Sequence, residues 1–140
     1  ALPNYSDSYY LSSPEEVEAI RGLFRVFLGQ AWEMLVRETL RRRAIPGVPG
    51  RWRKVARWWG NGIDRRPMEL DVVAESLDGQ TLLVGEAKLS LSAREAERTL
   101  AELKAKAANL PFAKDYSKTV ARLFVAEGGV SEAVSLEWLD

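Results

Sequence analysis

Two short charged patterns in the middle of the chain could together bind a divalent cation. Glu69 and Asp71 lie in one apolar segment, and Glu86 and Lys88 lie at the end of the next one. Carboxylate oxygens are the ligands that Mg²⁺ and Mn²⁺ prefer. A lysine beside a metal-bound water can orient the water or stabilise its charge. A site of this composition suits the hydrolysis of a phosphodiester.

A predicted hairpin brings these patterns together. Asp78-Gly79 favours a two-residue type I′ turn, so the numbers of facing residues sum to 157, as 78 and 79 do. Asp71 then lies opposite Glu86, and Glu69 lies opposite Lys88. All four side chains lie on the same side of the sheet, because side chains alternate along a strand with a period of two. Two facing carboxylates normally destabilise a sheet, and a cation between them reverses that cost. The alternative is that these charges form ordinary salt bridges at the end of a strand.

The elements around this hairpin predict an α/β fold. Ser13-Pro14-Glu15-Glu16 is a capping box that opens a helix, expected to run to about Arg43 with an interruption near Gly29. Ser92 and Glu95 form a second capping box and open another helix. Strands are expected at 54–59, 68–74, 81–88 and 119–126, with a short C-terminal one through Val134, Leu136 and Trp138. The order αβββαβ predicts a mixed central sheet flanked by helices, over residues 13–140. Residues 1–12 are expected to be an arm or a linker.

Composition narrows the chemistry that this chain can perform. The 140 residues contain no Cys and no His, which excludes disulfides, thiolate or imidazole ligands to zinc, and imidazole-based catalysis. No apolar run approaches the ~18 residues of a membrane helix, and no signal peptide is visible. We therefore expect a cytoplasmic protein that does not contact a membrane and that uses carboxylates, lysine or water for its chemistry.

Charge is unevenly distributed along the chain. Between Arg37 and Arg66 there are ten basic residues and two acidic ones, a local charge of +8, although the whole chain is neutral. Such a stretch can attract a phosphate backbone, or it can be a solvated face. Trp58 and Trp59 adjoin it and point to opposite sides of their strand, where core packing is favoured for both over base stacking. The residues expected to bind DNA are Arg51, Arg53, Lys54, Arg57, Arg65 and Arg66.

The acidic pattern resembles a known superfamily. An Asp on the second strand and a Glu-x-Lys motif on the third strand, within the order αβββαβ, resemble the motif pattern of the PD-(D/E)xK nuclease superfamily. This superfamily includes restriction endonucleases and archaeal Holliday-junction resolvases. A closer resemblance is to the nuclease-like domain that follows the ATPase domain of many archaeal-type ATPases. It covers roughly residues 29–126. The segments that carry it are Gly29-Gln30-Ala31-Trp32-Glu33, Arg57-Trp58-Trp59-Gly60, Glu69-Leu70-Asp71-Val72-Val73-Ala74 and Gly85-Glu86-Ala87-Lys88.

The resemblance implies a restriction-endonuclease-like fold and a role for each matching residue. Asp71 and Glu86 would bind Mg²⁺ or Mn²⁺, with the Ala87 carbonyl as a further ligand. Lys88 would position or activate water, and Glu33 would support the metal or the lysine from the first helix. DNA would be the substrate, an ATPase domain upstream in the same chain would be a partner, and a homodimer is left open. The alternative function is a non-catalytic DNA-binding or interaction module associated with the ATPase domain.

Overall fold

The fold is a four-stranded sheet between two helices. A computed structural model describes residues 13–127 and 133–140 of the chain. The elements, in chain order, are helix α2 (Pro14–Leu40), strands β1 (Trp52–Asn61), β2 (Pro67–Ser76) and β3 (Thr81–Lys88), helix α3 (Ala93–Ala108), the 3₁₀ helix η1 (Ala113–Asp115), strand β4 (Lys118–Val125) and the 3₁₀ helix η2 (Leu136–Leu139). The predicted α/β class and the order αβββαβ are confirmed.

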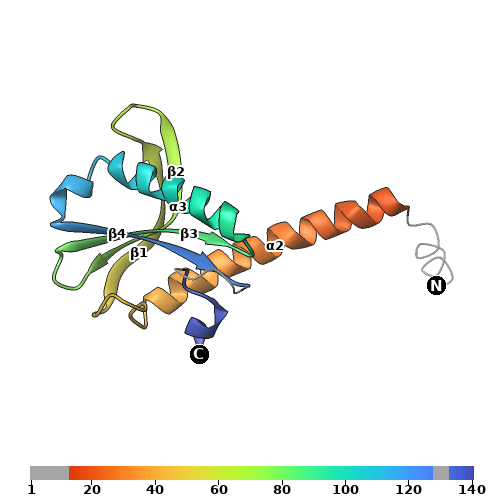
Figure 1. The fold of residues 1–140 in the computed structure, drawn as a ribbon, viewed down its shortest axis with the longest axis horizontal. Helices are drawn as coiled ribbons and strands as arrows, with labels where there is room; N and C mark the ends of the chain where they lie inside the picture. The colour runs from red at the N-terminus through yellow and green to blue at the C-terminus, as the bar shows by residue number, and fades with distance from the viewer. Residues whose placement is uncertain (1–12, 128–132) are drawn as a thin grey trace, which may run out of the picture.

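The sheet is mixed, with strand order β1-β2-β3-β4. The first two pairs, β1 with β2 and β2 with β3, are antiparallel, whereas β3 and β4 are parallel and are joined through α3. The C-terminal half of α2 packs on one face through Trp32, Val36 and Leu40. Helix α3 packs on the other face through Ala96, Leu103 and Ala107. Figure 1 shows the two helices on either side of the sheet.

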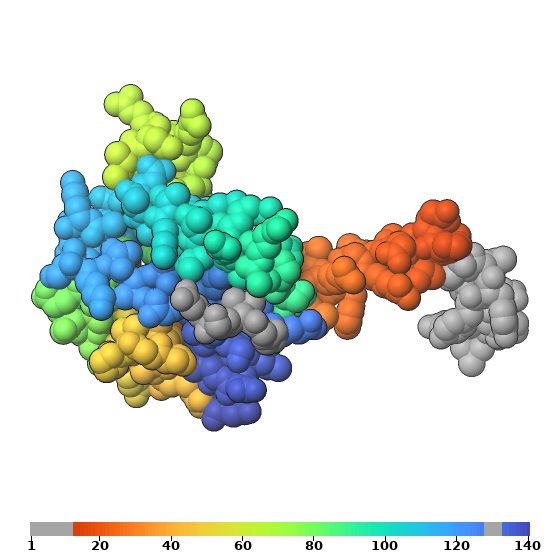
Figure 2. All heavy atoms as spheres, viewed as in Figure 1, coloured from red at the N-terminus to blue at the C-terminus, as the bar shows by residue number. Residues whose placement is uncertain are grey.

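Both helices begin where the capping boxes predicted. Ser13 accepts a hydrogen bond from the Glu16 backbone N–H at 3.1 Å, and Ser92 accepts one from the Glu95 N–H at 3.1 Å. Helix α2 is longer than the sheet needs: the side chains from Pro14 to Leu28 are all exposed, and this half projects away from the domain (Figures 1 and 2). The expected interruption near Gly29 is wrong, because α2 is continuous to Leu40.

The core of the sheet centres on Phe124 of β4, which is fully buried. The indole of Trp32 donates to the Phe124 carbonyl at 2.9 Å and so ties α2 to β4. Gly85 lies under the ring, where an added Cβ would come within 2.8 Å of Phe124 Cε2. Glycine is therefore required at this point of β3 for the strand and the ring to pack closely.

The predicted C-terminal strand is wrong. Val134 makes only an isolated parallel bridge with Phe124, and the following residues form η2. Side-chain contacts decide this conformation: the Trp138 indole donates to the Ala44 carbonyl at 2.9 Å, and Arg43 donates to the Trp138 carbonyl at 2.8 Å. The alternation of apolar residues at 134, 136 and 138 therefore does not mark an added strand.

The expected arm at residues 1–12 lies outside the described residues. No helix within residues 13–127 or 133–140 combines the length and the apolar character that crossing a membrane requires.

Candidate metal and nuclease site

The β2–β3 hairpin has the register that the turn predicted. Val72 pairs with Gly85 and Glu75 pairs with Leu82, so facing residue numbers sum to 157. The predicted two-residue type I′ turn is wrong: Gly79 has a φ of 73°, but Asp78 does not have the positive φ that this turn needs. The Gly79 N–H donates to the Ser76 carbonyl at 2.9 Å, and the loop between Ser76 and Thr81 keeps the same register. The regular pairing ends at Val72 and Gly85, one step before Asp71 and Glu86. The predicted hairpin places the two acids together, but at the point where the two strands stop pairing.

Asp71 fills the gap left by the missing strand pairing. Its Oδ2 accepts a hydrogen bond from the Ala87 backbone N–H at 2.8 Å, in place of a backbone carbonyl. Its own carbonyl accepts one from Arg37 of α2 at 3.0 Å. Asp71 is therefore held by β3 on one side and by α2 on the other. Ala87, expected as a ligand through its carbonyl, contacts Asp71 through its N–H.

Glu86 is a buried carboxylate on the face of β3 that α3 covers. The residue is 8% exposed. Burial is the main cause that raises its pKa, followed by hydrogen bonding to Asp71 and by the Asp71 charge, and together they raise the pKa of Glu86 to about 7. Lys106 opposes this rise through its hydrogen bond and its charge. The pair therefore holds less negative charge near neutral pH than two ordinary carboxylates would.

Lys106 is the residue of the site that sequence reasoning missed. Its Nζ donates to Glu86 Oε1 and to the Glu69 carbonyl, both at 3.0 Å, so it links β3 to β2 from above the sheet. One signal was available: Lys106 lies three residues after Leu103 and just before Ala107, which are both on the buried side of α3. The sequence does not give the angle at which α3 crosses the sheet. That angle is fixed at the end of the helix, where the Asn109 carbonyl accepts from the Ile63 N–H at 2.8 Å.

Glu33 of α2 completes the acidic group. Its pKa is raised, first by burial and then by the charge of the Asp71 carboxylate and by hydrogen bonding to it. Arg37 forms an ion pair with Glu33 at 3.7 Å and offsets part of this effect. Glu33 therefore lies beside Asp71, which is one of the two expected metal ligands. In residues 13–127 and 133–140, however, no three carboxylates converge on one point where they could hold a metal ion.

Lys88 lies at the end of β3, two residues after Glu86, and its side chain is exposed. No hydrogen bond or ion pair involves the Lys88 ammonium in the part of the chain that the structure describes. The cation that contacts the buried acid is therefore Lys106. The expected facing pair of Glu69 and Lys88 does not form, because the Glu69 carboxylate accepts from Arg57 of β1 at 2.7 Å.

The basic stretch is partly neutralised by acids of β2. Arg53 pairs with Glu75 at 2.6 Å, Lys54 lies 3.6 Å from the same carboxylate, and Arg57 pairs with Glu69. These acids lie outside the stretch in sequence, so the local charge of +8 overstates the field at the surface. Two β-bulges, at one of which Lys54 has a φ of 52°, bring the side chains of β1 into these pairs.

The two tryptophans of β1 point to opposite faces, but only one packs. Trp58 meets Phe112 edge to face at 5.7 Å between ring centroids. Trp59 is 72% exposed, in register with Glu69, so the preference for core packing of both is wrong. β1 is an edge strand, and Trp59 therefore presents a free indole face two residues from Arg57.

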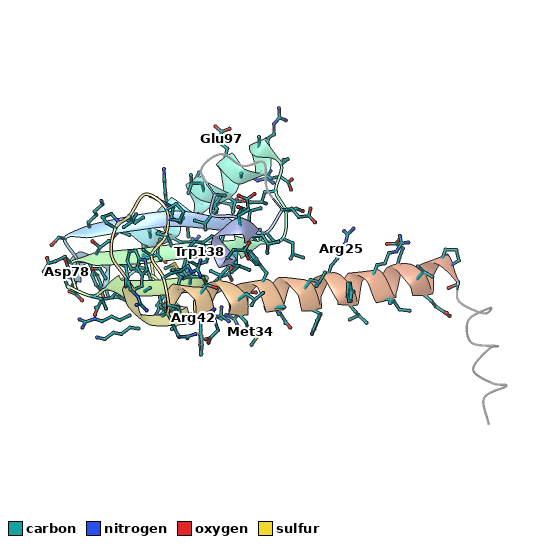
Figure 3. The ribbon with its side chains drawn as sticks, turned by 90° about the horizontal axis from the view of Figure 1, so that it is seen from below. Arg25, Met34, Arg42, Asp78, Glu97 and Trp138 are labelled. Carbon is teal, nitrogen blue, oxygen red and sulfur yellow. The ribbon has the colours of Figure 1, made fainter. Side chains whose placement is uncertain are left out.

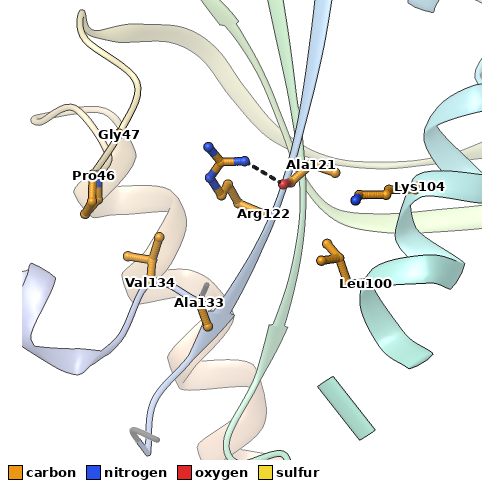
Figure 4. Close-up of a pocket in the computed structure, with 8 residues that line it drawn as sticks. All are labelled: Pro46, Gly47, Leu100, Lys104, Ala121, Arg122, Ala133 and Val134. Carbon is orange, nitrogen blue, oxygen red and sulfur yellow. Dashed lines mark hydrogen bonds between the residues drawn. The ribbon is translucent and has the colours of Figure 1, made fainter. Parts of the chain in front are cut away.

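A cavity of about 530 Å³ lies at the opposite edge of the sheet, beside β4 (Figure 4). Lys104 and Arg122 line it, and Arg122 donates to the Ala121 carbonyl at 3.0 Å. None of its lining residues is a carboxylate, so this cavity is separate from the site of Asp71 and Glu86.

Comparison with known proteins gives a family but no activity. A search among curated proteins finds no match, and neither does a search among solved structures. The model of one family, DUF234, described as archaea bacterial proteins of unknown function, matches residues 2–99, which is more than half of the chain and includes Glu33, Asp71 and Glu86. The chain therefore belongs to the DUF234 family.

Proposed function

We propose that this domain is a nuclease of the PD-(D/E)xK type that hydrolyses DNA phosphodiester bonds with Mg²⁺ or Mn²⁺. The observation that supports it most strongly is the pair Asp71 and Glu86. Two carboxylates lie within hydrogen-bonding reach at the edge of the core, and burial together with Asp71 raises the pKa of Glu86 to about 7. Two negative charges so close together in a buried site repel each other. Binding of a proton or of a cation removes this repulsion.

The residues present fit a small, hard cation. The site offers oxygen donors and no sulfur or imidazole, because the chain lacks Cys and His. Mg²⁺ is commonly bound by one or two carboxylates, with water and substrate phosphate supplying its other ligands. Asp71 and Glu86 would hold it, with the Ala87 carbonyl beside them. A bound cation would neutralise the phosphate oxygens and lower the pKa of an attacking water.

The chain's own side chains would position the pair and the substrate. The Ala87 N–H and Arg37 fix Asp71 through its carboxylate and its carbonyl. Lys106 fixes Glu86 and compensates part of its buried charge. Lys88, exposed on the same side of β3 as Glu86, would hold or orient the water and stabilise charge on it.

The DNA would approach along β1 and the hairpin beside it. The hydrogen bond and the charge of Glu69 are the main causes that raise the pKa of Arg57, and the nearby charges of Glu33 and Asp71 raise it further. Arg57 would therefore bring a guanidinium to the reacting phosphate by exchanging the Glu69 carboxylate for a phosphate oxygen. Arg51, Arg65 and Arg66 would contact phosphates further along the strand. Arg53 and Lys54 would contribute less, because both lie against the Glu75 carboxylate. The exposed Trp59 would stack on an unpaired base.

Cleavage assays test this function. Plasmid, single-stranded and branched DNA would be incubated with Mg²⁺ or Mn²⁺ and the wild type, Asp71→Asn or Lys88→Ala. Glu97→Gln, an exposed glutamate of α3, is the matched control for the loss of one carboxylate. We expect metal-dependent cleavage that is lost in Asp71→Asn and retained in Glu97→Gln. DNA binding without cleavage of any substrate would instead support the alternative, a non-catalytic DNA-binding module that serves an ATPase domain.

A further inference from the structure

Helix α2 carries a second apolar face that the domain does not cover. Its side chains recur at spacings of three and four residues, which is the a and d pattern of a coiled coil. We call this face the α2 stripe. It consists of Val17, Ile20, Phe24, Phe27, Ala31 and Met34. At about 1.5 Å per residue, it extends for about 26 Å.

The α2 stripe is exposed except at Ala31, which is half-buried. Ile20, Phe24 and Phe27 are 59–63% exposed, although each is a large apolar side chain. Met34 is 61% exposed even where α2 lies on the sheet, because the sheet takes the face that bears Trp32 and Val36. Figure 3 shows Met34 pointing away from the sheet, on the side opposite Arg25. Apolar surface of this extent on a soluble domain marks an interaction surface.

We propose that the α2 stripe pairs with the same stripe of a second copy, in an antiparallel two-helix coiled coil. An antiparallel pair packs a positions against d positions, so the numbers of facing residues sum to 51. Phe24 then packs on Phe27 of the partner subunit at the centre. Ile20 packs on the small Ala31 of the partner subunit on either side, and Val17 on the partner's Met34 at the ends. In this arrangement every facing pair contains at least one large side chain, which fills the space between the two helices. A parallel pair would place the two Ala31 side chains opposite each other and leave a gap.

Charge favours the same orientation. The first turn of α2 carries Glu15 and Glu16, and its last turn carries Arg37. An antiparallel pair in this register brings the acidic first turn of each helix to the basic last turn of the other, and a parallel pair would bring like charges together. The two-fold axis also closes the assembly, because each copy contributes the same face and leaves none of it free.

The mass of the chain in solution tests the proposal. Sedimentation equilibrium of the wild type should give about 31 kDa, twice the 15.7 kDa of one chain. Phe24→Glu places a charge at the centre of the α2 stripe and should raise the dissociation constant about 100-fold or more. Val26→Glu is the matched control: Val26 has the same 59% exposure as Phe24 but lies off the stripe, so this variant should remain a dimer. Circular dichroism should show that both variants stay folded.

Cysteine cross-linking tests the orientation, since the chain has no cysteine of its own. Ile20→Cys combined with Ala31→Cys should form covalent dimers on oxidation, and Ile20→Cys alone should not. A wild type that stays monomeric at high micromolar concentration would overturn the proposal. So would a dimer that Phe24→Glu leaves intact, or efficient cross-linking of Ile20→Cys alone.

Discussion

Replacing Glu86 with glutamine should change how the stability of the protein depends on pH. Glutamine has nearly the shape of the protonated glutamate and never ionises. In the folded wild type, the pKa of Glu86 is raised from 4.5 to about 7, chiefly by burial and then by Asp71. A folded-state pKa above the unfolded one means that the folded protein binds the proton more tightly. The stabilisation is complete below about pH 4.5 and is lost as the pH rises through 7.

The size of the effect follows from that rise in pKa. A shift from 4.5 to about 7 corresponds to about 3 kcal/mol of free energy of unfolding. The side chain is 11% exposed, so solvent screens this amount only weakly. Between pH 4 and pH 8 without divalent cations, the stability of Glu86→Gln relative to the wild type should therefore increase by about 3 kcal/mol. Glu33 and Asp71 are present in both proteins, so their direct contributions cancel in the comparison.

Urea unfolding followed by tryptophan fluorescence measures this difference at each pH. Glu97→Gln removes an exposed carboxylate of α3, and it controls for the change in net charge. A difference between Glu86→Gln and the wild type that stays constant across the pH range would show that Glu86 is not held in a desolvated, acid-paired environment.

Three further substitutions test separate parts of the account. Lys106→Met should raise the pKa of Glu86 further in an NMR titration, because it removes the cation that lowers it; an unchanged pKa would contradict their contact. Trp59→Ala should weaken binding of a labelled single-stranded oligonucleotide about 5- to 150-fold in fluorescence anisotropy, and unchanged affinity would exclude stacking. Gly85→Ala should destabilise the fold by about 1–3 kcal/mol in urea, because its Cβ would meet Phe124 at 2.8 Å.

Each of these three substitutions has a matched control substitution. Lys104→Met removes another lysine of α3, one that does not contact Glu86. Trp59→Phe keeps an aromatic face and should retain most of the affinity. Gly29→Ala adds the same methyl group as Gly85→Ala, but apart from its chain neighbours and the backbone of its own helix no atom lies within 4 Å of the added Cβ, and alanine favours the helix. If Gly29→Ala and Gly85→Ala destabilised the protein equally, close packing under Phe124 would not be the cause.

The core of the candidate site could be predicted because local rules determine it. A hairpin centred between Asp78 and Gly79 and the period of two along a strand are enough to place Asp71 beside Glu86, although the loop is longer than the predicted two residues. The pairing of residues 72–75 of β2 with residues 82–85 of β3 confirms the predicted register. The role of Glu33 in the site was predicted from the family resemblance and not from residue spacing. No local sequence pattern gives the angle at which α2 packs on the sheet.

The parts that the sequence did not predict depend on contacts between distant elements. Lys106 reaches Glu86 because the end of α3 docks on the turn between β1 and β2. Glu69 and Glu75 neutralise arginines that are distant in sequence, through the bulged pairing of β1 with β2. The end of the chain forms η2 because Trp138 hydrogen-bonds to the Ala44 carbonyl. Periodicity identifies a buried face, but it does not identify which element covers that face.

Calorimetric titration of Mg²⁺ and Mn²⁺ into the wild type and Asp71→Ala tests the cation site most directly. The wild type should bind the cation and release protons near pH 7, because the pKa of Glu86 is about 7 and ligands bind deprotonated. Asp71→Ala should bind much more weakly, while Glu97→Gln should match the wild type. Equal binding by Asp71→Ala and the wild type, or no binding by either, would contradict a cation site between Asp71 and Glu86.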